Sequence, residues 1–509
     1  MRLTITLRLR LLAWGLMLAL CGPAAGSVWV EPGDRRLRAD IELMKAHGLI
    51  KGPIDSWPLP WRSIEDAIAV AGQHALPPAV EAAVRRVAAL AERQQSRSRF
   101  EARASVTNEP ALVRDFGSPA RNAADLQLRA EHDLAPEVTF TYGVSYTSPG
   151  TDRQAITTER GNGFSLRPLQ VAAVVENLIL YAGYTELWWG PGQDGALLFS
   201  TSARPFPKAG VKLADARRID APVLRWLGPM RFDIFAGVLD EERDFRNTVV
   251  GGMRVEFEPT PGLTVGLSRG LQLCGEGRPC GIGTILRAII GLGDLDNTGT
   301  PFEPGNQLAG FDLQYRFPIG RGGDAATLYF DTIAEDEDNI IIEQFARQGG
   351  VRFAGPVGTR GASYSFGVEI TDTLASTFFG PRRFPGSMYN NFIYTDGFTY
   401  QRRPIGYSLD GDARMFTVHG SHTDLSNRRW YGAFRLIDLN VSAGRLNPDL
   451  VVNRVSQSRE RIAMASAGVE WPTRVGDLRF EARVQDNAPD TPGRAPLRVQ
   501  GEFGWVTRF

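Results

Sequence analysis

The segment from Tyr389 to Asp410 gathers the side chains that carbohydrate recognition requires. Aromatic rings stack on the apolar C–H patches of sugars, while guanidinium, carboxylate and amide groups hydrogen-bond to sugar hydroxyls. If the polymer is acidic, an arginine can grip a carboxylate in a bidentate manner. The alternative role is to fold a long loop and satisfy its backbone, and the two roles do not exclude each other. The candidates are Tyr389, Asn390, Asn391, Tyr394, Asp396, Tyr400, Arg402, Arg403, Tyr407 and Asp410.

Trp188 and Trp189 are a second aromatic candidate, followed directly by Gly190-Pro191-Gly192. They end an expected strand, at a position where the strands of a membrane barrel often carry an aromatic girdle. Because adjacent strand residues face opposite sides, one ring is expected at the lipid interface and the other in the barrel mouth. Girdle or turn packing is the favoured interpretation, and stacking on sugar is the alternative.

Catalysis finds little support in the sequence. The chain has five histidines. Three neighbouring residues, His419, Ser421 and His422, would place the two imidazoles on opposite faces of a strand, which disfavours a shared base or metal. There is no phosphate-binding glycine loop followed by lysine, and no HExxH pair. We therefore predict no catalytic residues and no cofactor.

A calcium loop is suggested only weakly, by Asp294, Asp296, Asn297 and Gly299. The acidic spacing is incomplete, and the twelfth position is Gly305 rather than glutamate, which rules out an EF-hand. No metal site is predicted.

Two cysteines, Cys274 and Cys280, lie in the glycine- and proline-rich stretch CGEGRPC. The third cysteine, Cys21, falls in the N-terminal segment that we expect to be removed. An even pair in an exported protein predicts a small loop-closing disulfide, and two thiols alone are a poor metal site.

The C-terminal segment from Leu497 to Phe509 alternates with a period of two and ends on an aromatic residue. Leu497, Val499, Phe503, Trp505 and Phe509 fall on one face, and polar residues fall mostly on the other. An exposed edge strand of this kind invites aggregation in water, but closure of a barrel in a membrane removes the edge. The pattern therefore favours a transmembrane strand, with the last strand of a soluble sandwich as the alternative.

The N-terminus predicts export. Arg2, Arg8 and Arg10 precede a short apolar run, and Ala24-Ala25-Gly26 supplies small residues for cleavage before Ser27. Lipidation at Cys21 is an alternative, but the bulky Leu20 suits it poorly. Lys+Arg and Asp+Glu both number 57, so no net charge points to nucleic acid.

The mature chain divides into two parts. Residues 27–95 carry three helical patterns: one capped by Asp34 and ending near Gly48, one with a capping box of Ser63 and Asp66, and one after Pro77-Pro78. From about residue 96 to 509 the period changes to two, and short turns alternate with long connections. Outer-membrane barrels show this asymmetry. The sequence thus predicts a signal peptide over 1–26, a periplasmic helical bundle over 27–95, and an all-β outer-membrane barrel of about eighteen antiparallel strands over 96–509.

Four blocks carry a family resemblance: SVWVEPGDRRLRADIELMKAHGLIKGPIDSWPLPW, ELWWGPGQDGALLFSTSARPFP, LCGEGRPC followed by GDLDN, and YNNFIYTDGFTYQRRPIGYSLDGD. In their order and spacing they resemble the Wzi-like capsule-assembly family, from about residue 27 to the C-terminus. The resemblance implies an eighteen-stranded outer-membrane barrel with a periplasmic helical bundle near its mouth. It also implies a lectin-like role in holding capsular polysaccharide or exopolysaccharide at the cell surface.

The function predicted from the sequence is thus non-enzymatic anchoring of surface polysaccharide in the outer membrane. The expected partners are this polysaccharide, outer-membrane lipid with its lipopolysaccharide, and the barrel-assembly machinery, for a protein expected to be a monomer. A porin or polysaccharide-export channel is one alternative, because a barrel of this size has a wide lumen unless loops fill it. A scaffold whose helical bundle docks periplasmic machinery or peptidoglycan is another.

Overall fold

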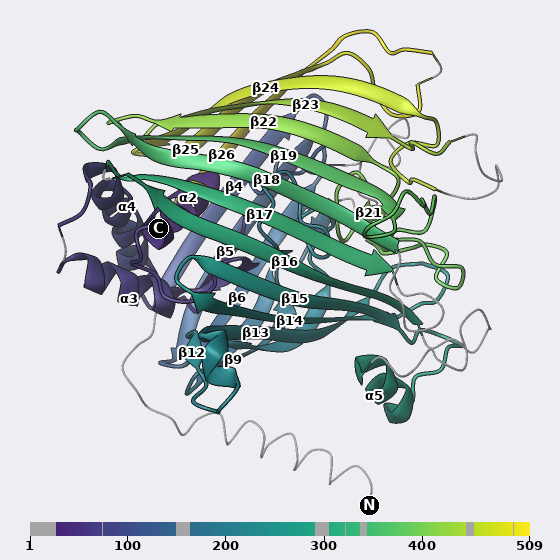
Figure 1. Ribbon diagram of the computed structural model, residues 1–509, viewed down its shortest axis with the longest axis horizontal. Coiled ribbons are helices and arrows are strands. Elements are labelled where there is room, and N and C mark those ends of the chain that lie inside the picture. The colour runs from purple at the N-terminus through teal and green to yellow at the C-terminus, as the bar shows by residue number, and fades with distance from the viewer. Residues whose placement is uncertain are drawn as a thin grey trace, which may run out of the picture.

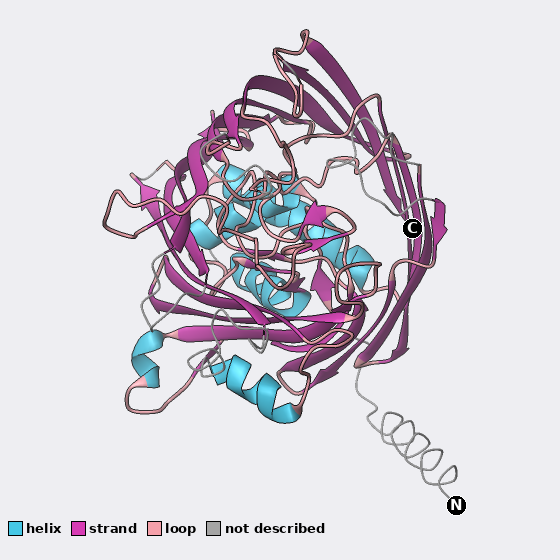
Figure 2. Cartoon of the chain, turned by 90° about the vertical axis from the view of Figure 1, so that its right-hand side faces the viewer, coloured by secondary structure: helices cyan, strands magenta, loops and turns pink. Residues whose placement is uncertain are grey.

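The chain forms a closed antiparallel β-barrel with helices at one end and within its ring of strands (Figures 1 and 2). The computed structural model describes residues 27–73, 75–148, 163–290, 305–320, 322–335, 344–443, 452–491 and 493–509. The predicted signal peptide and the weak calcium motif at Asp294–Gly299 lie outside these residues.

Eighteen strands build the wall. Two are interrupted: β7 and β8 both pair with β6, and β11 and β12 both pair with β13. The last strand closes onto the first, with Phe503 opposite Val106. The strands are β4 (Ser98–Thr107), β5 (Ala124–Ala135), β6 (Val138–Thr147), β7 (Gly163–Ser165), β8 (Leu169–Val175), β9 (Leu178–Tyr184), β11 (Pro207–Leu213), β12 (Arg217–Arg218), β13 (Pro229–Leu239), β14 (Thr248–Thr260), β15 (Leu263–Leu273), β16 (Gly305–Ile319), β17 (Asp324–Glu335), β18 (Gln344–Val357), β19 (Ala362–Ser376), β22 (Arg414–Thr423), β23 (Arg429–Leu439), β24 (Glu460–Thr473), β25 (Gly476–Gln485) and β26 (Arg498–Arg508).

The wall is apolar outside and polar inside. In β26 the outward Val499 is 62% exposed, whereas the inward Gln500 and Glu502 are buried. The two faces predicted for this strand are therefore confirmed. An outward apolar surface combined with closed backbone pairing is what a bilayer requires of a spanning barrel. Among the described residues, no helix is both long enough and apolar enough to cross a membrane.

The connections differ in length between the two ends of the barrel. At the end nearest α4 the turns are short, such as 176–177, 261–262 and 474–475. Three long connections at the other end position the candidate site, and we name them the first loop (108–123), the inner loop (185–206) and the lid (377–413). We call the two ends of the barrel the helical end and the loop end.

Within residues 27–97 of the described chain, three helices precede the wall: α2 (Arg35–Ala46), α3 (Trp61–Ala71) and α4 (Pro78–Gln94). As predicted, the Asp34 side chain caps α2 by accepting a hydrogen bond from the Leu37 amide at 2.9 Å. The predicted capping box at Ser63 is wrong, because α3 already begins at Trp61 after Pro60. The Ser63 hydroxyl instead donates to the Ala214 carbonyl beside the wall, at 3.3 Å.

The segment between α2 and α3 reaches the interior of the barrel. There β2 (Ser56–Trp57) pairs with β10 (Trp188–Trp189) of the inner loop, while β1 (Trp29–Val30) pairs with β3 (Leu59–Pro60). Figure 1 shows α3 and α4 at the left-hand end of the barrel. The bundle is fixed to the inner wall by ion pairs, Lys45 with Glu258 at 2.7 Å and Asp55 with Arg316 at 2.6 Å.

The girdle position predicted for the tryptophan pair is wrong. Trp188 and Trp189 are 0% and 1% exposed, and neither lies on the lipid face. Strand β9 ends at Tyr184 and the chain turns into the lumen, so that both rings become part of the interior packing. A strand period cannot reveal where a chain leaves the wall, which explains the error.

Arg38 of α2 joins the helices to the inner loop. Its guanidinium donates to the carbonyl oxygens of Pro191 and Gly192 at 2.8 and 2.9 Å, and it pairs with Glu42. It also lies over the Phe116 ring, 4.5 Å from the centroid. Arg38 thus satisfies two buried backbone acceptors that would otherwise lose their contact with water without compensation.

Arg35 ties the same helix to the first loop. It pairs with Asp115 at 2.6 Å. Burial acts to raise the pKa of Asp115, but Arg35 and Arg435 outweigh burial and hold that pKa at about 2. The carboxylate therefore stays ionised at neutral pH and keeps the first loop paired with α2.

We predict that Arg38→Ala loosens the inner loop. The variant leaves two buried carbonyls without their donor and leaves Arg352, 3.0 Å away, as the remaining ion-pair partner of Glu42. The two unpaired carbonyls should cost about 3 kcal/mol. The measurement is the opening free energy of residues 188–206, obtained from hydrogen–deuterium exchange of the folded protein. The matched control is Arg85→Ala in α4, because Arg85 is 63% exposed and pairs with the exposed Glu81. This control should change the same free energy by less than about 0.5 kcal/mol. Equal effects in the two variants would contradict the role of Arg38.

Candidate functional site

The lid is built on buried tyrosines. Its hairpin of β20 (Thr399–Tyr400) and β21 (Arg403–Pro404) packs over the lumen. Four tyrosine side chains of the lid are at most 1% exposed: Tyr389, Tyr394, Tyr400 and Tyr407. Burial of these rings supplies the apolar free energy that holds a loop of this length in one conformation.

The tyrosine hydroxyls connect the lid to other elements. Tyr389 donates to the Leu197 carbonyl of the inner loop at 2.5 Å. Tyr400 donates to Asp240 beyond β13 and accepts from Arg167 at 3.2 Å. A buried hydroxyl needs such a partner, so each contact also fixes the register of the lid on its neighbours.

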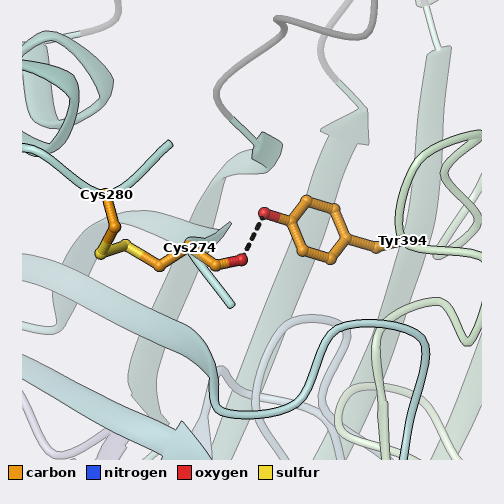
Figure 3. The surroundings of a disulfide bond; sticks show 3 residues. All are labelled: Cys274, Cys280 and Tyr394. Atoms are coloured by element: carbon orange, nitrogen blue, oxygen red, sulfur yellow. Dashed lines mark hydrogen bonds between the residues drawn. A yellow bond between two sulfur atoms is a disulfide. The ribbon is translucent and has the colours of Figure 1, made fainter. Parts of the chain in front are cut away.

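Tyr394 joins the lid to the cysteine pair (Figure 3). Its hydroxyl donates to the Cys274 carbonyl at 2.9 Å, and its ring meets the Phe245 ring edge-on at 5.4 Å. Cys274 and Cys280 form a disulfide in the structure. The pair thus closes a short loop directly after β15 while the lid packs against the same point.

Three charged residues of the lid are also buried: Arg403, Asp410 and Asp412. Arg403 donates to the Ser202 carbonyl at 3.0 Å, and Asp410 accepts from the Arg454 amide at 2.8 Å. Burial raises the pKa of Asp410 above its ordinary value, and Arg454 opposes that rise. Asn391 forms a local turn, because its side-chain oxygen accepts from the amides of Ile393 and Tyr394.

A more accessible surface lies where the lid meets the connection after β13, and we call it the rim (residues 391–402 with 240–247). Asp396 and Asp244 each accept the other's backbone amide at 2.8 Å. The Gln401 amide donates to Glu241 at 2.6 Å. Burial, together with the neighbouring Asp244, raises the pKa of Asp396. The rim is therefore a fixed surface with carboxylates at its edge.

Within the rim, Arg402 and Phe392 are exposed to solvent, Phe392 by 59%. Phe392 was not among the predicted residues, although an aromatic residue directly after Asn391 was the signal that could have identified it.

The structure divides the predicted site residues by their exposure to solvent. Trp188, Trp189, Tyr389, Tyr394, Tyr400, Arg403 and Asp410 are buried, Asn391 and Asp396 are half-buried, and Arg402 is exposed. Contact of any of them with a saccharide stays a prediction.

The histidines occupy the positions that the strand period implied. His419 and His422 both lie in β22, opposite Gly367 and Tyr364, on opposite faces of the strand. Within the part of the chain that the structure describes, no group of three or more His, Cys, Asp or Glu side chains could hold a metal ion.

The model of the capsule assembly protein Wzi matches residues 92–488 of this chain. The chain belongs to the Wzi capsule-assembly family. Among curated proteins, this Wzi-family chain is 27% identical over 421 residues to an uncharacterised 55.8 kDa protein in the cps region of Klebsiella pneumoniae, covering 81% of this chain and 78% of that one.

A solved structure has the same fold. It is Wzi of Escherichia coli, described as an outer-membrane protein involved in group 1 capsule assembly and as a carbohydrate-binding β-barrel. The TM-score is 0.76 at 21% identity, with 95% of this chain and 100% of that one covered. The present Wzi-family chain is accordingly an outer-membrane protein.

We predict that the lid becomes less stable as pH rises. Burial raises the pKa of Asp412 from its ordinary value of 3.8 to about 6. A raised carboxyl pKa favours the neutral form in the folded state, so this contribution is complete below about pH 4 and is lost as pH rises through 6, by up to about 3 kcal/mol. Asp412→Asn should remove this loss.

Hydrogen–deuterium exchange of residues 377–413, corrected for intrinsic pH dependence, checks this prediction. The variant should be more protected than the wild type at pH 7.5, and the two should converge at pH 4. Asp220→Asn, at an exposed carboxylate in a turn at the helical end, is the matched control and should change nothing. A wild-type lid as well protected at pH 7.5 as the variant would refute the assignment.

Proposed function

We propose that this protein is a non-enzymatic, lectin-like component of the outer membrane that holds capsular polysaccharide or exopolysaccharide at the cell surface. Membership of the Wzi capsule-assembly family supports a role with this class of polymer. The carbohydrate binding described for the Escherichia coli barrel of the same fold supports the lectin-like part. The protein would act as a monomer, inserted by the barrel-assembly machinery and surrounded by lipopolysaccharide.

The proposed orientation follows from the lengths of the connections. Outer-membrane barrels place short turns in the periplasm and long loops outside. The helical end, with the bundle and Phe509, would then face the periplasm, and the rim would face the polymer. The hydrogen bonds between Phe100 and Phe509 place the chain terminus beside the start of β4, at this same end.

The observation that carries the proposal is a lid packed on buried tyrosines that leaves Arg402 and Phe392 exposed. Most of the predicted aromatic residues do not contact solvent, so we assign them to positioning rather than to contact. The exposed Phe392 ring would stack on a sugar face, and Arg402 would pair with hydroxyls or with a carboxylate. The half-buried Asp396 and Asn391 would accept hydrogen bonds from neighbouring hydroxyls.

A fixed rim lowers the cost of binding, because its side chains are ordered before the polymer arrives. Each single contact with a sugar is weak. A polymer offers many repeats, and many barrels share one membrane, so multivalency would provide the retention that one site cannot.

We expect the double variant Phe392→Ala/Arg402→Ala to bind the host's own surface polysaccharide about tenfold more weakly than the wild type, equivalent to about 1.4 kcal/mol. Both residues are exposed, so the fold should be unaffected. The measurement is saturation binding of purified, detergent-folded protein, with heat-unfolded protein and an unrelated barrel beside it.

The matched control is Arg360→Ala, which removes an exposed arginine from a turn at the helical end. Its affinity should equal that of the wild type. Unchanged affinity of the rim variant, in a barrel shown to be folded, would refute the rim as the binding surface. Absence of binding by the wild type would refute the lectin-like function itself.

A channel is a second candidate, and one cavity supports it. It has a volume of about 390 Å³ and extends between the bundle and the wall, from Phe509 at the helical end to Thr147 and Arg204 towards the loop end. Arg103 and Arg508 line it, and Arg508 pairs there with Glu101 at 2.8 Å. A cavity beside the bundle with these charged residues in its lining would suit the movement of charged solutes.

Single-channel recording in planar bilayers distinguishes the two candidates. Since the bundle, the inner loop and the lid occupy the lumen, we expect no steady large conductance from the wild-type protein, with a general porin as positive control. A large and stable open state would favour the channel over the plugged binder.

A further inference from the structure

Helix α5 (Ile282–Ile290) lies outside the barrel wall, at the loop end (Figure 1, lower right). Neither the strand period nor the proposed polysaccharide function accounts for it. The helix follows β15 after the disulfide loop, and Ile285 packs against Leu271, Leu273 and Cys274.

The leucines beneath α5 belong to the lipid-facing side of the wall. Residues of odd number in β15 point outward, and among them Leu267 is 51% exposed. Leu271 and Leu273, further along the same face, are each only 3% exposed. The helix therefore covers one end of the apolar, outward-facing surface of β15.

Two attachments hold α5 in place. The Cys274–Cys280 disulfide ties the residues before the helix to the end of β15. At its other end, the outward Arg269 of β15 donates to the Ile289 carbonyl at 2.9 Å. Because the helix is attached to the wall at both ends, it cannot rotate, and the side that points away from the wall stays exposed.

That free face is apolar. Ile282, Leu286 and Ile289 are 79%, 56% and 39% exposed. Their spacing of four and three residues places them on one side of the helix. In water this surface would be costly, but next to a lipid-facing wall it extends the same apolar band.

We propose that α5 is a membrane-contact element, with Ile282, Leu286 and Ile289 packed against the acyl chains of outer-leaflet lipid. The continuity with Leu267, Leu271 and Leu273 identifies the occupant, because the outward wall of an outer-membrane barrel already faces lipid. The disulfide would set the depth of the helix, and the Tyr394 hydroxyl bonded to the Cys274 carbonyl links this depth to the lid. The proposal rests on the outer-membrane location and not on polysaccharide binding.

Photo-crosslinking in intact outer membranes tests it. The photoreactive p-benzoylphenylalanine replaces Ile282 in one variant, Leu267 in a second as positive control, and the exposed Glu276 of the disulfide loop in a third as water-facing control. After irradiation, adducts with lipopolysaccharide are detected by immunoblotting of the purified protein. We expect adducts at positions 267 and 282 and none at 276.

A dimer-sized adduct at position 282 would overturn the proposal in favour of contact between copies of the chain. Absence of any lipid adduct at 282, with one present at 267, would overturn it as well.

In a further variant the photolabel replaces Ile289 and the face is made polar by Ile282→Asp/Leu286→Asp. Its lipid adduct should fall at least about tenfold relative to the same label on the unaltered helix, because a carboxylate is excluded from the hydrocarbon region. An unchanged adduct there would refute the packing of this face on lipid.

Discussion

A barrel as wide as this one needs its lumen filled, and the arrangement of the helices and loops follows from that need. An eighteen-stranded wall encloses more space than its own inward side chains can occupy. The interior is also lined by charges such as Arg254 and Asp312, which lie 2.7 Å apart. Any segment of the chain that fills the lumen must therefore pair with these buried charges as well as occupy the volume. Arg38, with its bonds to the Pro191 and Gly192 carbonyls, shows how a helix meets this demand.

The same constraint explains the composition of the lid. A long loop can cover a barrel without moving only if it has a core of its own, and the buried Tyr389, Tyr400 and Tyr407 supply it. The residues that looked most suited to sugar are thus largely used to hold the lid, while Arg402 and Phe392 stay exposed. Recognition and stability are divided between neighbouring residues of one segment.

Prediction from the sequence worked where short-range rules apply. The period of two in β26 and the cap of Asp34 on α2 depend on local geometry, and the structure has both. It failed where distant segments compete for the same residue. Ser63 bonds to the wall rather than capping a helix, and Trp188 pairs across to Trp57 instead of facing lipid. Nothing in the residues around either position reveals a partner more than a hundred positions away.

Four features of this protein can be predicted from the sequence alone: the barrel, its last strand, the presence of helices before the wall and the family to which the chain is related. These follow from alternation, from capping residues and from motif blocks that can be read in order. Three other features depend on how distant segments pack together: which aromatic residues reach solvent, the contact of the bundle with the inner loop inside the lumen, and the position of α5 on the outer wall. The physical reason is that burial is a property of all the elements packed around a side chain, whereas the sequence specifies only the element to which it belongs.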